Sequence, residues 1–380
     1  MAERDKERFF LNVHFFLSGI CFSTWASRIP TIKEFFDFND AELGTVLLFM
    51  PIASLVGLPL SGWLVSRFDS RQPMTVGLMM LTTSLVLIGW ASTPFLLICS
   101  VSVFAFSMRI MNIAINTQSL ALQNKFERKI NGTFHGLWSL GGIAGVGVST
   151  LFVGLQVSIG LHFSIVALIA FFTALFIYPY LLKNDRATSG NKLIFSKPDP
   201  YIVYLGLLVF FAAICEGGMF DWSGVYFNEV VKEELFTLGY LIFMICMALS
   251  RFATDRFMEQ YGMPRTYMIS AGLIMIGIAV AVVFPYFWPA LMGFCLVGLG
   301  TAAIIPMTFL LAGSSKKYSV GVTISIISTY SIVGMLIGPP LIGYVSNALN
   351  LRIAFIIFGL AGFMLIPISQ FLFRYQRQQK

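Results

Sequence analysis

A row of polar side chains runs along one apolar stretch of the sequence. The stretch VSVFAFSMRIMNIAINTQSLALQ carries polar residues at intervals of 3, 4, 3 and 4, namely Arg109, Asn112, Asn116, Ser119 and Gln123. A helix places residues at these intervals on one face. A guanidinium at bilayer depth costs about 2.5 kcal/mol or more, so it normally faces a bundle interior or a water-filled cavity. The pattern therefore predicts a pathway for a polar solute.

The chemistry of this stripe suits recognition of a substrate. Arg109 could bind an anionic group, and the amides of Asn112 and Asn116 could donate to and accept from hydroxyls or amides. The alternative is that Arg109 forms a permanent ion pair with a buried carboxylate such as Glu216, because a lone charge in hydrocarbon needs a partner.

A second stripe lies near the N-terminus, at intervals of 4, 3, 4 and 3: His14, Ser18, Cys21, Trp25 and Arg28. One interpretation is a cavity wall in which Trp25 offers a platform for a sugar-like ring. The other is helix packing with an interfacial tryptophan. Trp138, Trp222 and Tyr330 are further candidates for stacking or hydrogen bonding with the substrate.

Three titratable residues could couple transport to protons. Glu216 precedes Gly217 and Gly218, which can loosen a helix, and a buried carboxyl that changes environment can carry a proton. Asp221 is the second candidate, and His135 could relay a proton. Alternatively, the carboxylates are static partners of Arg28 or Arg109.

A further group of residues is expected to control conformation. Arg251 and Asp255 are four residues apart, which favours a pair within one helix. Together with Arg67 and Arg71 they predict a latch at the cytoplasmic end, and Arg28 lies near the outer end. The complete set of expected gate residues is Arg28, Gly62, Arg67, Arg71, Arg251, Asp255 and Glu259.

The elements that position these residues are membrane helices. Of the 380 residues, 57% are hydrophobic and 11% are charged, whereas a soluble domain carries about 25% charged residues. Apolar runs of about 20 residues recur. They predict twelve spans: roughly 9–29, 41–66, 74–92, 95–122, 133–155, 159–182, 201–228, 235–258, 265–284, 288–313, 318–346 and 351–373.

The spans fall into two related halves. The polar segment 183–200 predicts a cytoplasmic linker between an N-terminal six-helix bundle (1–182) and a C-terminal one (201–380). The segments 24–27 and 221–224 share a Trp-containing pattern at similar depth, and spans 5 and 11 both carry glycine-rich stretches. Such duplication is typical of secondary transporters, whose substrate site lies at the repeat interface.

The distribution of Lys and Arg predicts the orientation. They gather in the loops on the side of both termini, and the other side has only Arg28, Lys33, Lys232 and Arg352. The positive-inside rule then places both termini in the cytoplasm. The same clustering in short loops argues against nucleic acid as a partner, despite a net charge of +7.

Other chemistry finds little support in the sequence. The five cysteines lie in apolar segments without metal-like spacing, which indicates small buried hydrophobes rather than disulfides or ligands. No nucleotide-binding loop, metal cluster or nucleophile–base set is present, so we expect no enzyme activity, no cofactor and no metal. The expected partners are a small molecule, protons and the lipid bilayer, and we expect a monomer.

The loop after span 2 resembles the signature of the major facilitator superfamily (MFS), G-x-L-x-D-R-x-G-x-R/K. Gly62, Leu64, Arg67 and Arg71 match, while Ser66 replaces the acid and Asp69 replaces the second glycine. In the second copy, Glu259 occupies the place of the acid. The resemblance covers all twelve spans and implies an all-α fold of two pseudo-symmetric six-helix halves, in which spans 1, 4, 7 and 10 line the cavity.

Four segments are similar to the YbjJ-like bacterial inner-membrane group, near the fucose permease branch: WASRIPTIKE, INTQSLALQ, FHGLWSLGGIAG and CEGGMFDW. The resemblance implies an inner-membrane location and sugar:proton symport. Fucose-permease-like symporters use carboxylates in spans 1 and 4. This chain has none there, and Asn112 and Gln118 occupy the relevant stretch of span 4.

The sequence therefore predicts a secondary transporter that moves a small polar solute by alternating access, driven by protons. A sugar, sugar acid or amino sugar is the expected substrate. The alternatives are an exporter of drugs or amphipaths, a lipid flippase, an uncoupled facilitator and a sensor that no longer transports. A flippase would favour a lateral apolar opening over a polar stripe.

Overall fold

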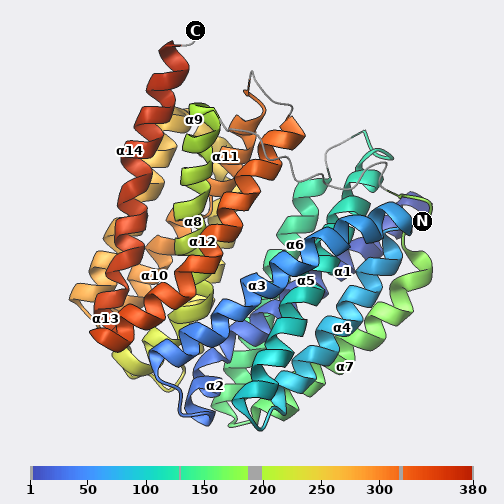
Figure 1. Cartoon of the computed structure of the whole chain (residues 1–380), viewed down its shortest axis with the longest axis horizontal. Coiled ribbons are helices and arrows are strands. Elements are labelled where there is room, and N and C mark those ends of the chain that lie inside the picture. Colours follow the sequence, from blue (N-terminus) through green and yellow to red (C-terminus); the bar gives the residue numbers. More distant parts are fainter. Residues whose placement is uncertain (1–2, 128–129, 187–198, 316–319, 379–380) are drawn as a thin grey trace. The chain divides into compact units, whose positions relative to one another are not determined.

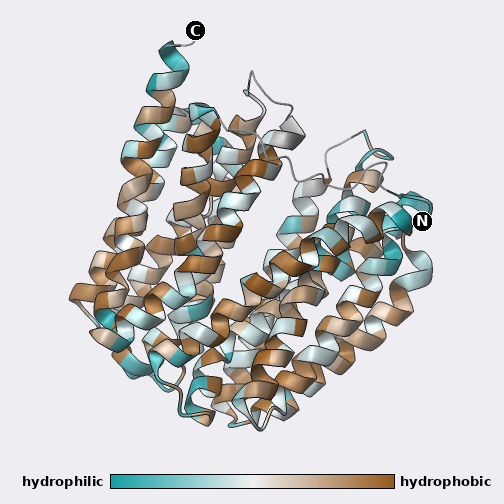
Figure 2. Cartoon of the chain, in the orientation of Figure 1, coloured by the Kyte–Doolittle hydropathy of each residue, from teal (hydrophilic) through white to brown (hydrophobic). Residues whose placement is uncertain are grey.

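The computed structural model describes residues 3–127, 130–186, 199–315 and 320–378. Within these ranges the chain forms helices and no strand. Twelve stretches of the described residues are long and apolar enough to cross a membrane, which confirms the expected number of spans. Figure 2 shows hydrophobic residues along the bodies of the helices and hydrophilic ones concentrated towards their ends and in the loops.

The chain divides into two compact units. Unit 1 comprises Met1–Phe36 and Phe49–Lys192, and unit 2 comprises Asp37–Leu48 and Leu193–Lys380. The linker expected at 183–200 lies largely outside the described residues, which omit 187–198. The division into two six-helix bundles at this linker stays a prediction.

Unit 1 is built from long helices joined by short loops. Helix α1 packs on α6, and α4 packs on α5 and α7 (Figure 1). The bounds are α1 (Glu3–Ser27), α2 (Ile29–Phe35), α4 (Arg71–Gly89), α5 (Pro94–Gln123), α6 (Asn131–Gly154), α7 (Ile159–Ile177) and the short η1 (Tyr178–Tyr180), with most of α3 (Asp40–Arg67).

The helix that carries the Arg109 stripe begins where its sequence predicts. Thr93 has an extended backbone and its hydroxyl accepts a hydrogen bond from the Leu96 amide at 3.3 Å, while Pro94 occupies the first turn. A threonine cap satisfies one of the free amides of the first turn, and proline at this position loses no helical hydrogen bond. Asp199 and Pro200 start α8 in the same way, with Asp199 accepting from the Ile202 amide at 3.0 Å.

Unit 2 contains the other long helices. Helix α12 packs on α8, α10 packs on α9, and α14 packs on both α8 and α9. The bounds are α8 (Pro200–Tyr226), the π-helical turn η2 (Phe227–Val231), α9 (Thr237–Val283), α10 (Phe287–Thr301), α11 (Ile304–Ala312), α12 (Val320–Ala348), α13 (Leu351–Ala354) and α14 (Ile356–Gln378).

Helix α9 contains two of the candidate spans, Thr237–Thr254 and Arg256–Val283, and has a kink within the second. Gly262 adopts a φ of 75° and a ψ of 156°, and Pro264 follows it. Only glycine reaches this region without strain, and proline cannot continue the hydrogen-bonding pattern of the preceding turn. The loop expected at 255–265 is therefore reduced to this kink.

The first part of α3 belongs to unit 2, where it packs against α12. The Asp40 carboxylate accepts a hydrogen bond from the Ser346 hydroxyl, and the hydroxyls of Thr45 and Tyr344 lie 3.0 Å apart. Between these pairs, a Cβ added to Gly44 would lie 3.2 Å from the Cα of Gly343. A contact this close requires glycine on both helices.

Glycines set the spacing between α1 and α6. A Cβ on Gly141 would collide with the carbonyl of Phe16, and one on Gly19 would collide with the carbonyl of Trp138. Small residues at such crossings let two membrane helices approach at backbone distance. The same device recurs in unit 2, where a Cβ on Gly334 of α12 would lie 2.5 Å from the carbonyl of Phe210 on α8.

The Gly141→Ala variant tests this contact. We expect a loss of about 1–3 kcal/mol, because the new methyl group must push α6 away from α1. Gly147→Ala on the same helix is the matched control, since an added Cβ there meets nothing within 4 Å and alanine favours helix. Thermal unfolding in detergent should show a lower midpoint for Gly141→Ala only. Equal midpoints would mean that the α1–α6 contact does not limit stability.

Candidate functional site

Arg109 lies on α5 with most of its guanidinium unused. Its Nε donates to the hydroxyl of Ser54 on α3 at 2.7 Å, and Gly57 of α3 leaves room for its Cβ. Among the described residues of unit 1, no carboxylate forms an ion pair with Arg109, and its terminal nitrogens have no hydrogen-bond partner. The side chain is partly exposed. A partly exposed guanidinium with both terminal nitrogens free is arranged to bind a carboxylate or phosphate in a bidentate manner.

The polar stripe of α5 divides into two parts. Asn112 and Asn116 are partly exposed, and Asn116 Nδ2 donates to the Asn112 carbonyl at 2.7 Å. The Asn112 amide and the Asn116 side-chain oxygen have no partner among the described residues. In contrast, Ser119 is buried, and Gln123 accepts from the Ile130 amide at 2.7 Å. The part of the stripe that a solute can reach therefore runs from Arg109 to Asn116.

The N-terminal stripe is buried in this structure. His14, Ser18, Cys21, Trp25 and Arg28 are all between 0 and 4% exposed. The Trp25 ring packs 6.1 Å from the ring of Phe104 on α5. A solute cannot reach the face of Trp25 here, so the arrangement matches the packing interpretation of this stripe and not the cavity wall.

Arg28 has partners that its spacing did not indicate. Its Nε donates to His162 Nδ1 at 3.2 Å, and its Nη2 donates to the Val157 carbonyl at 2.9 Å. Within unit 1 an imidazole and a carbonyl are therefore its partners, and a static pair between Arg28 and a carboxylate of unit 2 stays a prediction. The bond to Nδ1 requires a histidine with an unprotonated Nδ1. This cluster joins the end of α1 to the start of α7.

We expect His162→Leu to destabilise the protein by about 1–3 kcal/mol, because the buried Arg28 Nε loses its acceptor. Replacing both residues, as Arg28→Met with His162→Leu, should cost less than the sum of the single changes, because no unpaired charge is left. Thermal midpoints of the two single variants and the double variant measure this coupling. Strictly additive midpoint shifts would mean that the two side chains do not interact.

Glu216 is engaged in an ion pair within unit 2. Its Oε1 accepts from Nη2 of Arg251 on α9 at 2.9 Å, and Glu216 is 7% exposed. Glu216 thus has a partner within its own unit, and the alternative that it pairs with Arg109 of unit 1 stays a prediction. The side chain of Asp255 lies outside the described residues, so the expected pairing of Arg251 with Asp255 stays a prediction beside this pair between helices.

Asp221 contrasts with Glu216 although it lies only five residues further along α8. It is partly exposed, and its carboxylate has neither a hydrogen bond nor an ion pair within the described part of the chain. Of the two candidate proton carriers, Glu216 is thus paired with a cation, whereas the Asp221 carboxylate is partly exposed and has no partner among the described residues.

The remaining candidates differ in accessibility. Trp222 is fully buried. Trp138 is partly exposed, and its ring centroid lies 6.0 Å from that of Phe22. Tyr330 is also partly exposed, and its ring packs against Gly206. His135 is exposed, with its ring 5.6 Å from that of Phe15. Trp138 and Tyr330 are thus reachable by a solute, whereas Trp222 is not in this structure.

The loop after α3, which resembles the family signature, forms ion pairs and hydrogen bonds with the segment that follows η1. Asp69, which replaces the second glycine, forms ion pairs with Arg186 at 3.2 Å and Arg71 at 4.0 Å. Asp185 accepts from both the amide and the hydroxyl of Ser70. Asp69 thus supplies a carboxylate three residues after the position where the signature has its acid, and its main partner follows η1.

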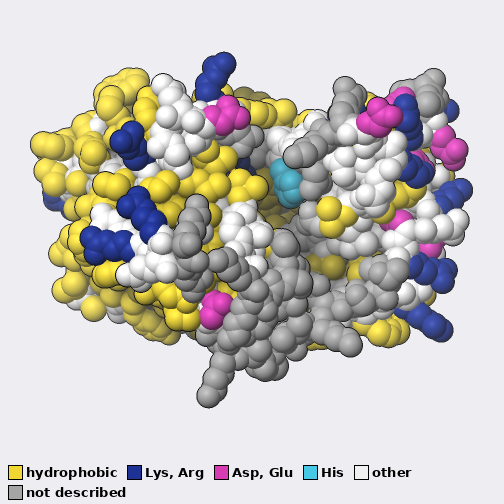
Figure 3. All heavy atoms as spheres, turned by 90° about the horizontal axis from the view of Figure 1, so that it is seen from above, with side chains coloured by type: hydrophobic (Ala, Val, Ile, Leu, Met, Phe, Trp, Pro, Cys, Tyr) yellow, Lys and Arg dark blue, Asp and Glu magenta, His cyan; other side chains and the backbone are white. Residues whose placement is uncertain are grey.

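The other gate candidates are distributed around this loop and its counterpart in unit 2. Arg71 also stacks 5.0 Å from the Tyr178 ring, Gly62 is partly exposed, and Arg67 and Glu259 are exposed. A latch between these residues and Arg251 stays a prediction. Figure 3 shows Lys and Arg side chains distributed over the face seen from above.

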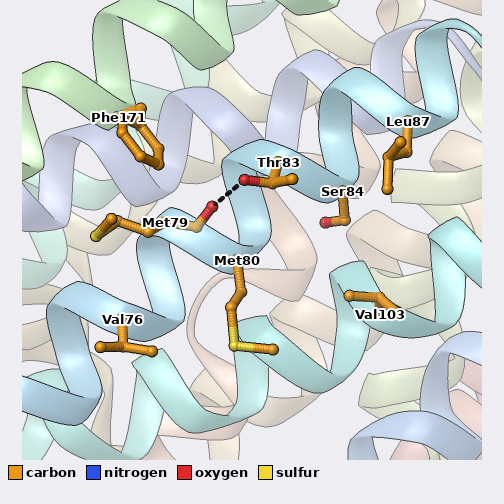
Figure 4. Close-up of a pocket in the computed structure, with 8 residues that line it drawn as sticks. All are labelled: Val76, Met79, Met80, Thr83, Ser84, Leu87, Val103 and Phe171. Carbon is orange, nitrogen blue, oxygen red and sulfur yellow. Dashed lines mark hydrogen bonds between the residues drawn. The ribbon is translucent and has the colours of Figure 1, made fainter.

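A groove on unit 1 has a different character from the stripe. It has a volume of about 320 Å³ and lies between α4, α5 and α7, where Met80, Leu87 and Phe171 contribute to its lining (Figure 4). The hydroxyls in its wall are satisfied within α4, since Thr83 donates to the Met79 carbonyl at 2.8 Å and Ser84 to the Leu81 carbonyl at 2.7 Å. The groove presents no free polar group to a solute and suits contact with lipid chains.

Sequence reasoning missed Ser54, Asp69 and His162 as partners of the charged residues. Ser54 lies 55 positions from Arg109, and His162 lies 134 positions from Arg28. No local spacing signals such contacts. Only Asp69 left a signal in the sequence: it is an acidic residue in the signature-like loop, where Ser66 replaces the acid that the signature has.

Comparisons with known proteins agree with this architecture. A family model of the Major Facilitator Superfamily matches residues 11–315 and, in a second match, 235–380. An MFS-type transporter of Yersinia pestis is 29% identical over 359 residues, 93% of this chain and 92% of the relative. Membrane protein MosC of Rhizobium meliloti is 29% identical over 372 residues, 96% of this chain and 90% of MosC.

Solved structures show the same fold. The nucleoside transporter NupG superposes with a TM-score of 0.76 at 16% identity, covering 99% of this chain and 100% of NupG. A bacterial homologue of the human lysosomal transporter Spinster, in an inward-facing and unoccupied conformation, gives 0.75 at 13% identity, with 98% of each chain covered.

Proposed function

Because the chain belongs to the Major Facilitator Superfamily, we propose that the solute it transports is small, hydroxylated and carries a carboxylate, and that protons drive its movement. Sugar acids are the first members of this class, followed by neutral sugars and amino sugars. The proposal rests on one observation, the partly exposed guanidinium of Arg109, whose terminal nitrogens have no partner among the described residues of unit 1.

Recognition by Arg109 follows from its fixed geometry. The bond from Nε to Ser54 holds the plane of the guanidinium, so less rotational freedom is lost when a carboxylate binds. Asn112 and Asn116 follow on the same face and offer a donor and an acceptor for hydroxyls. Trp138, also in unit 1, is partly exposed and could cover an apolar ring face of the solute. Tyr330 is the partly exposed aromatic candidate of unit 2.

The free-energy cost of a charge at membrane depth favours an anionic ligand at Arg109. An unpaired cation within a membrane-spanning helix is costly, and a bound anion relieves that cost through charge-assisted hydrogen bonds. The site would then bind an anion more tightly than its neutral counterpart, because the neutral molecule leaves the guanidinium unpaired. This difference defines the specificity that we propose.

Proton coupling is assigned to the Glu216–Arg251 pair. Protonation of Glu216 removes its charge, breaks the ion pair and frees the segment of α9 that carries Arg251. Deprotonation restores the pair. Alternating access needs an element with two arrangements, and a charge pair that forms and breaks with the proton supplies one. Asp221 is the alternative carrier to Glu216.

We place both termini on the cytoplasmic side of a bacterial inner membrane. The support is the excess of Lys and Arg in the loops on that side of the sequence. Transport in the inward direction then moves the solute towards the linker and both chain ends.

A thermal-shift screen of the purified protein tests the substrate class. The panel should contain sugar acids, the matching neutral sugars, amino sugars and nucleosides, the last because NupG is a nucleoside transporter. We expect stabilisation by a sugar acid and little by its neutral counterpart. Hits are then tested for uptake in proteoliposomes. Preferential stabilisation by neutral sugars or nucleosides would contradict the anionic class.

A further inference from the structure

Two free thiols meet on neighbouring helices of unit 2. Cys246 of α9 and Cys295 of α10 are both unbridged, and their Sγ atoms lie 2.9 Å apart. This is closer than two non-bonded sulfur atoms ordinarily pack. A disulfide has a sulfur–sulfur length of about 2.05 Å, so less than about 1 Å of movement would close the bond.

The helix register holds the two thiols opposite each other. A Cβ on Gly298 of α10 would lie 2.5 Å from the Phe243 carbonyl and 3.2 Å from the Cβ of Cys246, so the two backbones approach closely here. One turn further along both helices, the Ser250 hydroxyl donates to the Leu299 carbonyl at 2.9 Å. Contacts on both sides of the thiols thus fix their relative position.

We propose that Cys246 and Cys295 form a redox-active dithiol that closes to a disulfide between α9 and α10. The two thiols have different roles because they differ in exposure. Cys295 is partly exposed, whereas Cys246 is 6% exposed. Cys295 is the thiol that meets the oxidant, and Cys246 is the thiol that resolves the intermediate.

The oxidant is a small membrane-permeable disulfide, RSSR. Cys295 gives its proton to solvent and its sulfur attacks one sulfur of RSSR, so that one RS⁻ leaves, takes up a proton and a mixed disulfide forms on Cys295. Cys246 then loses its proton and attacks the Cys295 sulfur, displacing the second RS⁻, which is also protonated. Two protein thiols are oxidised to one disulfide, and RSSR is reduced to two RSH.

The resulting bond would fasten α10 to the segment of α9 that carries Arg251, five residues beyond Cys246. The other cysteines lack this arrangement. Cys215 is buried with its thiol 3.4 Å from the Phe358 carbonyl, Cys21 is buried, and Cys99 is exposed on α5 of unit 1. Cys99 would react with an oxidant without a partner and must be removed from any test.

The test uses the full-length Cys99→Ser protein in detergent with 4,4′-dithiodipyridine, a small apolar disulfide. Each displacement releases one thiopyridone, which absorbs light. We expect two equivalents of thiopyridone per protein, an intact mass that has lost two hydrogens, and a cross-linked peptide pair containing Cys246 and Cys295. A denatured sample of the same protein verifies that its thiols are reduced at the start.

Two variants separate the roles of the thiols. Adding Cys246→Ala should give one equivalent of thiopyridone and one probe group retained on Cys295. Adding Cys295→Ala should leave Cys246 unreacted on the same time scale. The proposal is overturned if the Cys99→Ser protein releases no thiopyridone while its denatured sample does, or if it retains the probe group without forming the cross-link.

Discussion

The Arg109→Ala variant is expected to lose roughly 10- to 150-fold in affinity for its anionic substrate. A hydrogen bond to a charged group is worth about 1.5–3 kcal/mol, and 1.4 kcal/mol corresponds to a factor of ten. Here the guanidinium offers terminal nitrogens that no described protein group uses. Binding measured by calorimetry or thermal shift, with the best ligand of the screen, gives the value directly.

Two matched variants make this result specific. Arg109→Lys keeps the charge but loses the planar fork and the bond to Ser54, so we expect an intermediate loss. Ser54→Ala keeps the guanidinium and removes only its anchor, so the loss should be smaller still. The Arg109→Ala protein should remain folded and extractable, because removing an unpaired charge costs the membrane-embedded structure little. Unchanged affinity in that variant would show that Arg109 is not a ligand.

The second large effect concerns Glu216. We expect Glu216→Gln to abolish proton-driven accumulation in proteoliposomes while counterflow exchange continues. Glutamine keeps the size and a hydrogen-bond acceptor for Arg251 but cannot take up or release a proton. Counterflow needs only binding and the conformational change, whereas accumulation needs the proton step. The measurement compares both modes of transport in the same vesicles.

Asp221→Asn is the control on the same helix. Its carboxylate has no ion pair within the described residues, so removal of its charge disturbs no observed contact. If Glu216 is the carrier, Asp221→Asn retains accumulation. Loss of accumulation in Asp221→Asn alone would transfer the coupling role to Asp221. Accumulation with an unchanged pH dependence in Glu216→Gln would remove Glu216 from the mechanism.

The membrane architecture could be predicted because its determinants are local. Apolar runs of about 20 residues and the scarcity of charge specify membrane helices wherever they occur, and the structure contains the expected twelve. The 3.6-residue period also determined that Arg109, Asn112 and Asn116 share a face. The glycines of α6 and α12 indicated close helix approach, which Gly141 and Gly334 show.

Tertiary structure decided the partner of each charge. Spacing along one helix predicted a pair of Arg251 with Asp255, whereas the packing of α9 on α8 brings Glu216 to Arg251, a partner that spacing did not indicate. Arg28 meets His162 of α7 in place of a carboxylate. In each case the observed partner lies on another helix, so the pairing depends on helix packing between residues far apart in the sequence.

The sequence by itself thus determined the helices, their faces and the presence of an energetically costly arginine at membrane depth. It could not distinguish a ligand-binding arginine from a permanently paired one, nor reveal that Cys246 and Cys295 meet although they are 49 positions apart. Periodicity fixes which side of a helix a residue occupies, whereas only packing fixes what lies opposite. That physical difference gave Glu216 its partner Arg251 and left the terminal nitrogens of Arg109 without a partner among the described residues of unit 1.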